Sequence, residues 1–142
     1  MKKIFLLACL FLLTGCGKQL NPVEYVENNF GFHIPSDVRI IRIDDTHDGF
    51  HGDGTFYLEA RLETDQIPLF IQAISQTGKW KRLPLPESVV KNYQCKPTMI
   101  YLPGKLKNGL YYLHDFSPEK DSYAIAILNL DTNELFVYKA DF

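Results

Sequence analysis

Apolar and polar residues alternate without a break from residue 56 to residue 63, and this pattern constrains the fold more than any other in the chain. The apolar set is Phe56, Leu58, Ala60 and Leu62, and the set between them is Tyr57, Glu59, Arg61 and Glu63. Successive side chains of a β-strand point to opposite faces of its sheet. The segment therefore predicts a strand of an antiparallel sheet that has one face covered and one face in water.

The segment that follows predicts a helix that covers the apolar face of this strand. Its apolar residues recur at helical spacing, at Ile67, Phe70, Ile71 and Ile74. Pro68 is tolerated only in the first turn of a helix, so Thr64 or Asp65 is expected as the N-cap. Gly78 is expected to end this helix.

The remaining elements predict an α+β domain. Further strands are expected over residues 38–43, 97–102, 110–116, 122–130 and 134–140. Residues 80–86 are expected to be irregular, and residues 86–93 to form a short helix. The fold class is thus α+β, with an antiparallel sheet of about five or six strands and a helix packed on one face.

A short N-terminal helix is predicted directly before the sheet. Asn21 suits the N-cap, Pro22 suits the first helical position, and Glu24 can complete a capping box. Gly31 is expected to end the helix. The apolar residues Val23, Val26 and Phe30 share one face of it.

The first residues of the chain have the pattern of a secretory signal. Lys2 and Lys3 precede an apolar run of ten residues from Ile4 to Leu13. Ten residues of helix cover roughly 15 Å, which is half of the ~30 Å hydrocarbon core of a bilayer. The run is therefore too short to span a membrane.

The sequence Leu13-Thr14-Gly15-Cys16 resembles the lipobox of bacterial lipoproteins. The resemblance implies that Cys16 carries a diacylglyceryl group, becomes the new N-terminus, and is N-acylated (typically with palmitate) in many species. Two or three acyl chains anchor a protein stably. Gly17 after the cysteine favours the outer membrane in a Gram-negative host, and the outer face of the cell membrane is expected otherwise.

These features divide the chain into three parts. Residues 1–15 are a lipoprotein signal peptide, residues 16–21 are the lipidated cysteine and a short tether, and residues 22–142 are a single domain. Removing Lys2 and Lys3 with the signal leaves 13 basic and 17 acidic residues, a net charge of −4. An acidic domain without a basic patch argues against a nucleic-acid partner.

Only one cysteine remains in the domain. Cys9 leaves with the signal and Cys16 carries lipid, so Cys95 has no intramolecular partner. Three interpretations of Cys95 stay open: a small buried hydrophobe, an intermolecular disulfide, or a reactive thiol.

The segment Asp44–Gly54 has the densest chemistry in the chain, and it predicts the connection between two strands. It contains four Asp, two of the four His and three of the nine Gly. One interpretation is purely local, because Gly supplies positive φ and Asp side chains bond loop N–H groups. A second is a recognition loop for a small ligand or a protein, with the candidate residues His47, Asp48, Phe50, His51 and Asp53. A third is a metal site made by His47, His51, Asp48 and Asp53, and catalysis is a fourth.

The segment Asp45-Thr46-His47-Asp48-Gly49-Phe50-His51-Gly52-Asp53-Gly54 is similar to a segment of small uncharacterised bacterial proteins, which are often lipoproteins. The similarity extends loosely through Trp80–Pro84 to the C-terminal strands. This resemblance implies one compact domain and implies no activity.

The functional expectation is a membrane-anchored envelope lipoprotein that acts as a non-enzymatic binding module. No P-loop, nucleophile elbow or dinucleotide fingerprint is present in the sequence. The expected partners are the membrane, through the lipid on Cys16, and an envelope protein. No cofactor is expected beyond this covalent lipid. The alternative is a metal-binding envelope protein, including a metal-dependent hydrolase, that uses the Asp44–Gly54 segment.

Overall fold

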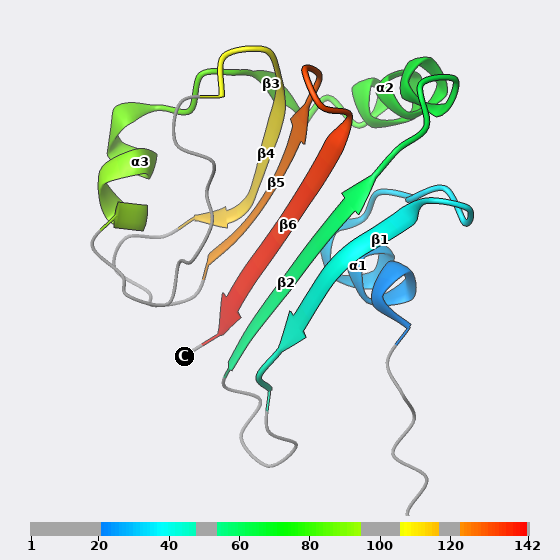
Figure 1. Cartoon of the computed structure of the whole chain (residues 1–142). Helices are drawn as coiled ribbons and strands as arrows, with labels where there is room; N and C mark the ends of the chain where they lie inside the picture. The colour runs from blue at the N-terminus through cyan, green and yellow to red at the C-terminus, as the bar shows by residue number, and fades with distance from the viewer. Residues whose placement is uncertain (1–20, 48–53, 95–105, 117–122, 142) are drawn as a thin grey trace, which may run out of the picture.

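The computed structural model describes residues 21–47, 54–94, 106–116 and 123–141 (Figure 1). In chain order the elements are α1 (Pro22–Phe30), β1 (Arg39–Asp45), β2 (Gly54–Arg61), α2 (Gln66–Gln76), β3 (Lys81–Arg82), α3 (Glu87–Gln94), β4 (Gly109–Phe116), β5 (Tyr123–Asn129) and β6 (Glu134–Asp141). The strands form one antiparallel sheet in the order β1-β2-β6-β5-β4-β3. The predicted α+β class with an antiparallel sheet of about five or six strands is confirmed, and the sheet has six.

Strand β2 has the alternation that its sequence predicts. Its apolar side chains and the following Leu62 are at most 1% exposed, whereas Tyr57 and Glu59 are only half-buried and Arg61 is exposed. β2 pairs with β6 over its whole length, from Gly54 opposite Asp141 to Arg61 opposite Glu134. This pairing joins the β1–β2 hairpin to the C-terminal strands.

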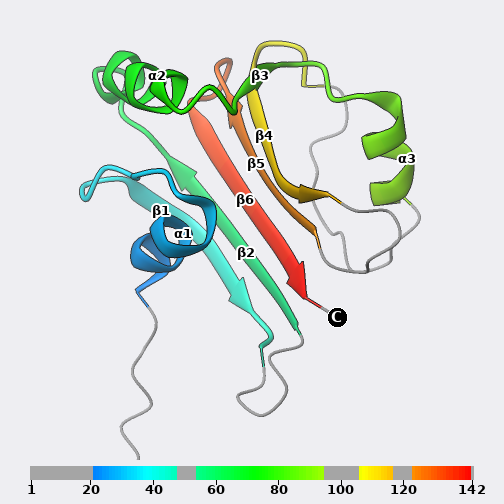
Figure 2. The same cartoon turned by 180° about the vertical axis from the view of Figure 1, so that it is seen from behind.

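One face of the sheet carries the main hydrophobic cluster. Helix α1 lies in front of the sheet in Figure 2. The strands contribute residues such as Leu58, Leu128 and Val137 to the cluster, while α1 and α2 contribute Val26, Phe30, Phe70 and Ile74. Phe32, which follows α1, lies with its ring centroid 5.2 Å from that of Trp80. Its ring is also within 6.5 Å of the rings of Phe30, Phe70 and Tyr112. Burying each such side chain contributes roughly 1.5–3 kcal/mol.

The opposite face of the sheet is also covered, over strands β4 to β6. All seven residues of β5 are buried. A second cluster forms here from sheet residues such as Ile125, Ile127 and Phe136, together with Leu83 and Val89 from the segment around α3. The prediction of one face in water is therefore wrong for these strands. It holds for the edge strand β1, most of whose residues are exposed.

The N-terminal helix has the predicted N-cap at Asn21 and the predicted glycine at its end. The Oδ1 atom of Asn21 accepts a hydrogen bond of 3.1 Å from the N–H of Val23, and Pro22 is the first helical residue. Gly31 follows the helix with φ 70°, and its N–H donates to the carbonyl of Glu27. Left-handed backbone of this kind favours glycine because other residues carry a Cβ atom.

Strand β1 differs from its predicted range of 38–43. A bulge lies between Ile40 and Arg42, and beyond it the ladder continues to Asp45, opposite Phe56. Asp44 and Asp45 therefore belong to the strand rather than to the loop, and Gly54 already belongs to β2. The local residue types suggested a turn, but the pairing with β2 extends the strand.

One other segment differs from its prediction. The segment expected to be irregular contains the short strand β3, which pairs with β4. The helix α2 begins at Gln66 with Asp65 as its N-cap, as predicted, although Asp65 makes no side-chain cap bond. The strand predicted over residues 97–102 lies outside the described residues.

None of the helices in the described part of the chain is long and apolar enough to cross a membrane.

Candidate functional site

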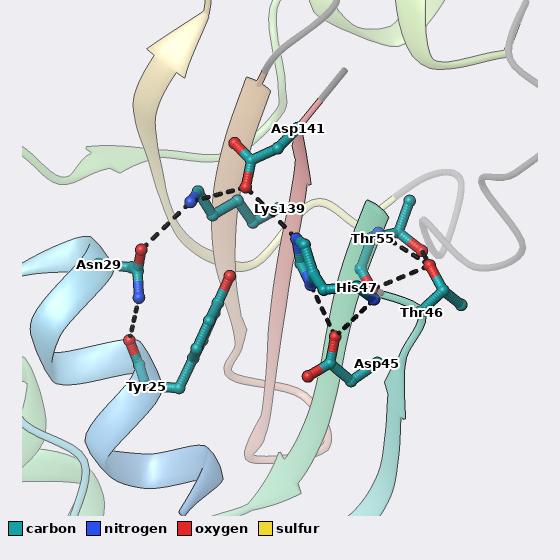
Figure 3. A network of polar contacts seen from close by, with 8 residues as sticks. All are labelled: Tyr25, Asn29, Asp45, Thr46, His47, Thr55, Lys139 and Asp141. Atoms are coloured by element: carbon teal, nitrogen blue, oxygen red, sulfur yellow. Dashed lines mark hydrogen bonds and ion pairs between the residues drawn. The ribbon is translucent and has the colours of Figure 1, made fainter. Parts of the chain in front are cut away.

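A cluster of polar side chains lies at the end of the sheet where β1 and β6 end and β2 begins (Figure 3). Helix α1 lies beside it, because the ring of Tyr25 stacks on that of Phe56 in β2 with centroids 4.1 Å apart. The members that interact here are Tyr25, Asn29, Asp45, Thr46, His47, Thr55, Lys139 and Asp141, and we call them the sheet-end cluster.

His47 lies at the centre of the sheet-end cluster, between two carboxylates. Its Nδ1 atom is 2.6 Å from Oδ1 of Asp45, and its Nε2 atom is 3.3 Å from Oδ2 of Asp141. Both contacts are hydrogen bonds only when both ring nitrogens carry a proton, since a carboxylate accepts and does not donate. The His47 side chain is 18% exposed, so these contacts are partly shielded from water.

Asp45 also fixes the main chain of His47. The N–H of His47 donates to Oδ1 of Asp45 at 3.1 Å, which is a local bond of the Asx-turn type. The same carboxylate oxygen therefore holds both the backbone and the ring of His47.

Lys139 links the carboxylate of Asp141 to helix α1. Its Nζ atom is 2.8 Å from Oδ2 of Asp141 and donates to Oδ1 of Asn29 at 3.2 Å. Asn29 in turn donates from Nδ2 to the carbonyl of Tyr25 at 2.9 Å. One chain of contacts thus connects β1, β6 and α1.

The hydroxyl group of Tyr25 lies in an environment that disfavours its ionised form. Burial is the main cause, and the negative charges of Asp141 and Asp45 add to it, so that together they raise the pKa of Tyr25 to about 12. The Nζ atom of Lys139 lies 6.0 Å from the centroid of the Tyr25 ring. Tyr25 therefore stays a neutral phenol that packs against Phe56.

The base of the β1–β2 connection is closed by two threonines and a glycine. The N–H of Thr46 donates to the carbonyl of Thr55 at 2.9 Å, and the N–H of Thr55 donates to Oγ1 of Thr46 at 2.9 Å. A Cβ atom at Gly54, where φ is 157°, would lie 2.7 Å from the backbone of His47. The glycine is therefore required here for close approach of the two chain segments.

Of the five binding candidates in the loop, the structure describes one, His47. The partners of His47 are Asp45 and Asp141. Asp48, Phe50, His51 and Asp53 lie outside the described residues, and so does Cys16. The recognition-loop and metal hypotheses for these residues stay predictions.

Sequence reasoning missed most of the sheet-end cluster. Asp45 was recognised only as one acid of a loop, whereas it is a strand residue that holds His47. Lys139 and Asp141 are 92 and 94 positions from His47 in the sequence, and only the β2–β6 pairing brings them near it. No local pattern in the sequence signals this contact.

The arrangement suits positioning rather than chemistry on a substrate. Both ring nitrogens of His47 face carboxylates of the same chain, so a substrate or metal at either nitrogen would have to replace one of these bonds. Across residues 21–47, 54–94, 106–116 and 123–141, no group of three or more His, Cys, Asp or Glu side chains is arranged to hold a metal ion.

Comparison of the chain with protein-family models, with curated proteins and with solved structures gives no match.

The substitution Asp141→Asn tests whether the sheet-end cluster stabilises the domain. It removes the charge shared by His47 and Lys139, and we expect a loss of about 1–2 kcal/mol in the free energy of unfolding. Urea denaturation measures this difference. Asp37→Asn, which changes an exposed carboxylate away from the cluster, is the matched control and should change stability by less than about 0.5 kcal/mol. Equal effects of the two substitutions would show that the cluster is not stabilising.

The substitution Tyr25→Phe tests the alkaline behaviour of the domain. The pKa of Tyr25 is raised in the folded state from 10.0 to about 12, so its contribution is complete below pH 10 and is lost as the pH rises from 10 to 12. Tyr25→Phe should therefore reduce the loss of stability over this interval, by roughly 1 kcal/mol after solvent screening. Thermal unfolding at pH 8, 10 and 12 measures it, and parallel curves for the two proteins would contradict it.

Proposed function

We propose that this protein is a lipid-anchored lipoprotein of the bacterial envelope whose domain is a non-enzymatic binding module. The anchor is Cys16, and the site of attachment is the extracytoplasmic face of a membrane, which is the outer membrane in a Gram-negative host. The observation that carries the non-enzymatic role is the engagement of both His47 ring nitrogens by Asp45 and Asp141. The most chemically suggestive residue of the chain is thereby explained as a structural one.

The position of α1 supports a role close to the membrane. The ring of Tyr25, in the first half of α1, lies 6.2 Å from that of His47, so α1 lies at the same end of the sheet as the start of the β1–β2 connection. Only residues 17–20 separate Cys16 from Asn21, and four residues reach at most roughly 14 Å. A lipid on Cys16 would thus hold the sheet-end cluster near the bilayer surface.

Rigid support at the base of the β1–β2 connection favours recognition as its task. Thr46 and Thr55 close this base with main-chain and side-chain hydrogen bonds, and His47 is tied to the last strand through Asp141. A connection that leaves so fixed a base can present Phe50, His51 and their neighbours to a partner at reduced entropic cost. We therefore assign binding of an envelope component to residues 48, 50, 51 and 53, next to the membrane.

The arrangement of helices agrees with such a support. We infer that α1 and α2 form one layer on the face of the sheet that bears Phe56 and Leu58. Contacts of Phe32 with both Phe30 and Phe70 support this layer, because Phe32 bridges the two helices.

Cys16→Ala tests the anchor. The wild-type protein should sediment with membranes and dissolve only in detergent, whereas Cys16→Ala should lose its acyl chains and appear in the soluble fraction. Cell fractionation with immunoblotting measures the distribution. Cys95→Ala is the matched control and should stay with the membranes. Retention of Cys16→Ala in the membrane fraction would disprove lipid anchoring at this residue.

Metal analysis separates the binding module from the metal-dependent alternative. We expect the purified, detergent-solubilised protein to carry no stoichiometric metal and to unfold at the same temperature with and without a chelator, because His47 is engaged by carboxylates of its own chain. A metal that is retained by wild type and by His33→Ala, but lost in His47→Ala, would instead establish the alternative. His33 is a suitable control because its side chain is 73% exposed.

A further inference from the structure

Strand β1 forms one edge of the sheet and carries two exposed isoleucines among four charged residues. Ile41 and Ile43 are each 43% exposed, and within the described residues the other large hydrophobic side chain that is clearly exposed is Leu69 in α2. The opposite edge of the sheet, β3, has only two residues, Lys81 and Arg82, and both are exposed. Short, basic edges of this kind resist pairing with other chains, whereas a longer edge strand with exposed isoleucines can extend a sheet.

The main-chain groups of β1 show which residues face outward. The N–H of Thr46 donates to the carbonyl of Thr55, so Thr46 directs its main-chain groups toward β2. Main-chain direction alternates along a strand, and therefore Asp44 and Arg42 also face β2, while Ile43 and Asp45 face away from it. In the part of the chain that the structure describes, no other strand pairs with this outer side of β1.

The charges of β1 are arranged so that the strand complements itself in antiparallel orientation. Basic residues occupy its first half, with Arg39 and Arg42, and acidic residues its second half, with Asp44 and Asp45. A two-fold axis at Ile43 places Arg42 of each copy opposite Asp44 of the other and the two Ile43 side chains opposite each other. Opposite charges and apolar pairs directly across two strands are the favourable combinations.

Two further features limit the assembly to a pair. The bulge between Ile40 and Arg42 interrupts the edge, so regular pairing is confined to the residues after it. An isologous contact of one edge with its own copy closes on itself, because each β1 edge is then paired and is no longer open to a third chain. Arg42 and Asp44 already form an ion pair within one chain, and the second copy would join two such pairs into one group of four charges.

We propose that β1 is a homodimerisation edge, with a second copy of this chain as its partner and Ile43 on the two-fold axis. The two six-stranded sheets then form one continuous antiparallel sheet. This dimer depends neither on the lipid at Cys16 nor on the binding role assigned to residues 48–53.

Disulfide trapping in intact cells tests the dimer and its register, with the full-length chain in a Cys95→Ser background. Ile43→Cys places two thiols directly opposite each other, at a Cα separation of about 5.5 Å, which a disulfide can bridge. Ile41→Cys is the matched control, because Ile41 is equally exposed. In the proposed register Ile41 lies opposite Asp45 of the second copy, so the two Ile41 residues are offset by four positions, or roughly 13 Å along the strand. Leu69→Cys controls for random collision between exposed thiols.

We expect a covalent dimer on non-reducing gels for Ile43→Cys and monomers for Ile41→Cys and Leu69→Cys. Equal cross-linking of all three variants, or none with Ile43→Cys, would overturn the proposal. The Cys95→Ser parent, which retains Cys16 but has no introduced thiol, measures any cross-linking through Cys16, so that a failure of lipid attachment is distinguished from a failure of the dimer.

Charge exchange supplies an independent test in the Ile43→Cys background. Arg42→Asp and Asp44→Arg each place like charges opposite each other, and each should lower the cross-linked fraction at least several-fold. The double variant Arg42→Asp/Asp44→Arg restores opposite charges and should recover the dimer. Thermal unfolding establishes that each variant is folded, and a double variant that cross-links no better than the folded single variants would disprove the proposed register.

Discussion

The pairing of β2 with β6 is the interaction on which the rest of this structure depends. It runs for eight residue pairs between segments that are more than seventy positions apart in the sequence. It aligns Leu58 with Val137 and Ala60 with Leu135, so that the apolar face of β2 becomes part of a wider buried surface. Forming such a contact carries a loop-closure cost, which the burial of both strands offsets. Without it, the β1–β2 hairpin would have no core, since a two-stranded hairpin alone is marginally stable.

The same pairing creates the sheet-end cluster. Because Gly54 is opposite Asp141, the last charged residue of β6 lies beside the base of the β1–β2 connection and reaches His47. A histidine between two carboxylates invites a catalytic interpretation. Here one carboxylate comes from β1 and the other from β6, and Lys139 continues the contacts to α1. The more direct interpretation is that these polar contacts hold β1, β6 and α1 together at the exposed end of the core. Groups that are partly shielded from water stabilise a structure best when each has a partner.

The two lateral sides of the sheet have different environments. On the side of β4, β5 and β6, both faces are covered, and every residue of β5 is buried. On the side of β1, the face toward α1 is covered, while Ile41, Ile43 and the charges around them remain accessible. The buried strands thus support an accessible edge at β1, to which the proposed self-association belongs.

Sequence by itself determined the features that depend on neighbouring residues. The caps of α1 at Asn21 and Gly31 and the alternation along β2 follow from contacts within a few positions, and the structure has all of them. Most strand and helix ranges were also correct to within about two residues. Only the tertiary structure decided the strand order, the second covered face, the extension of β1 to Asp45 and the partners of His47. These depend on which distant segments meet, and that choice is made by the burial of whole strands together rather than by any local pattern.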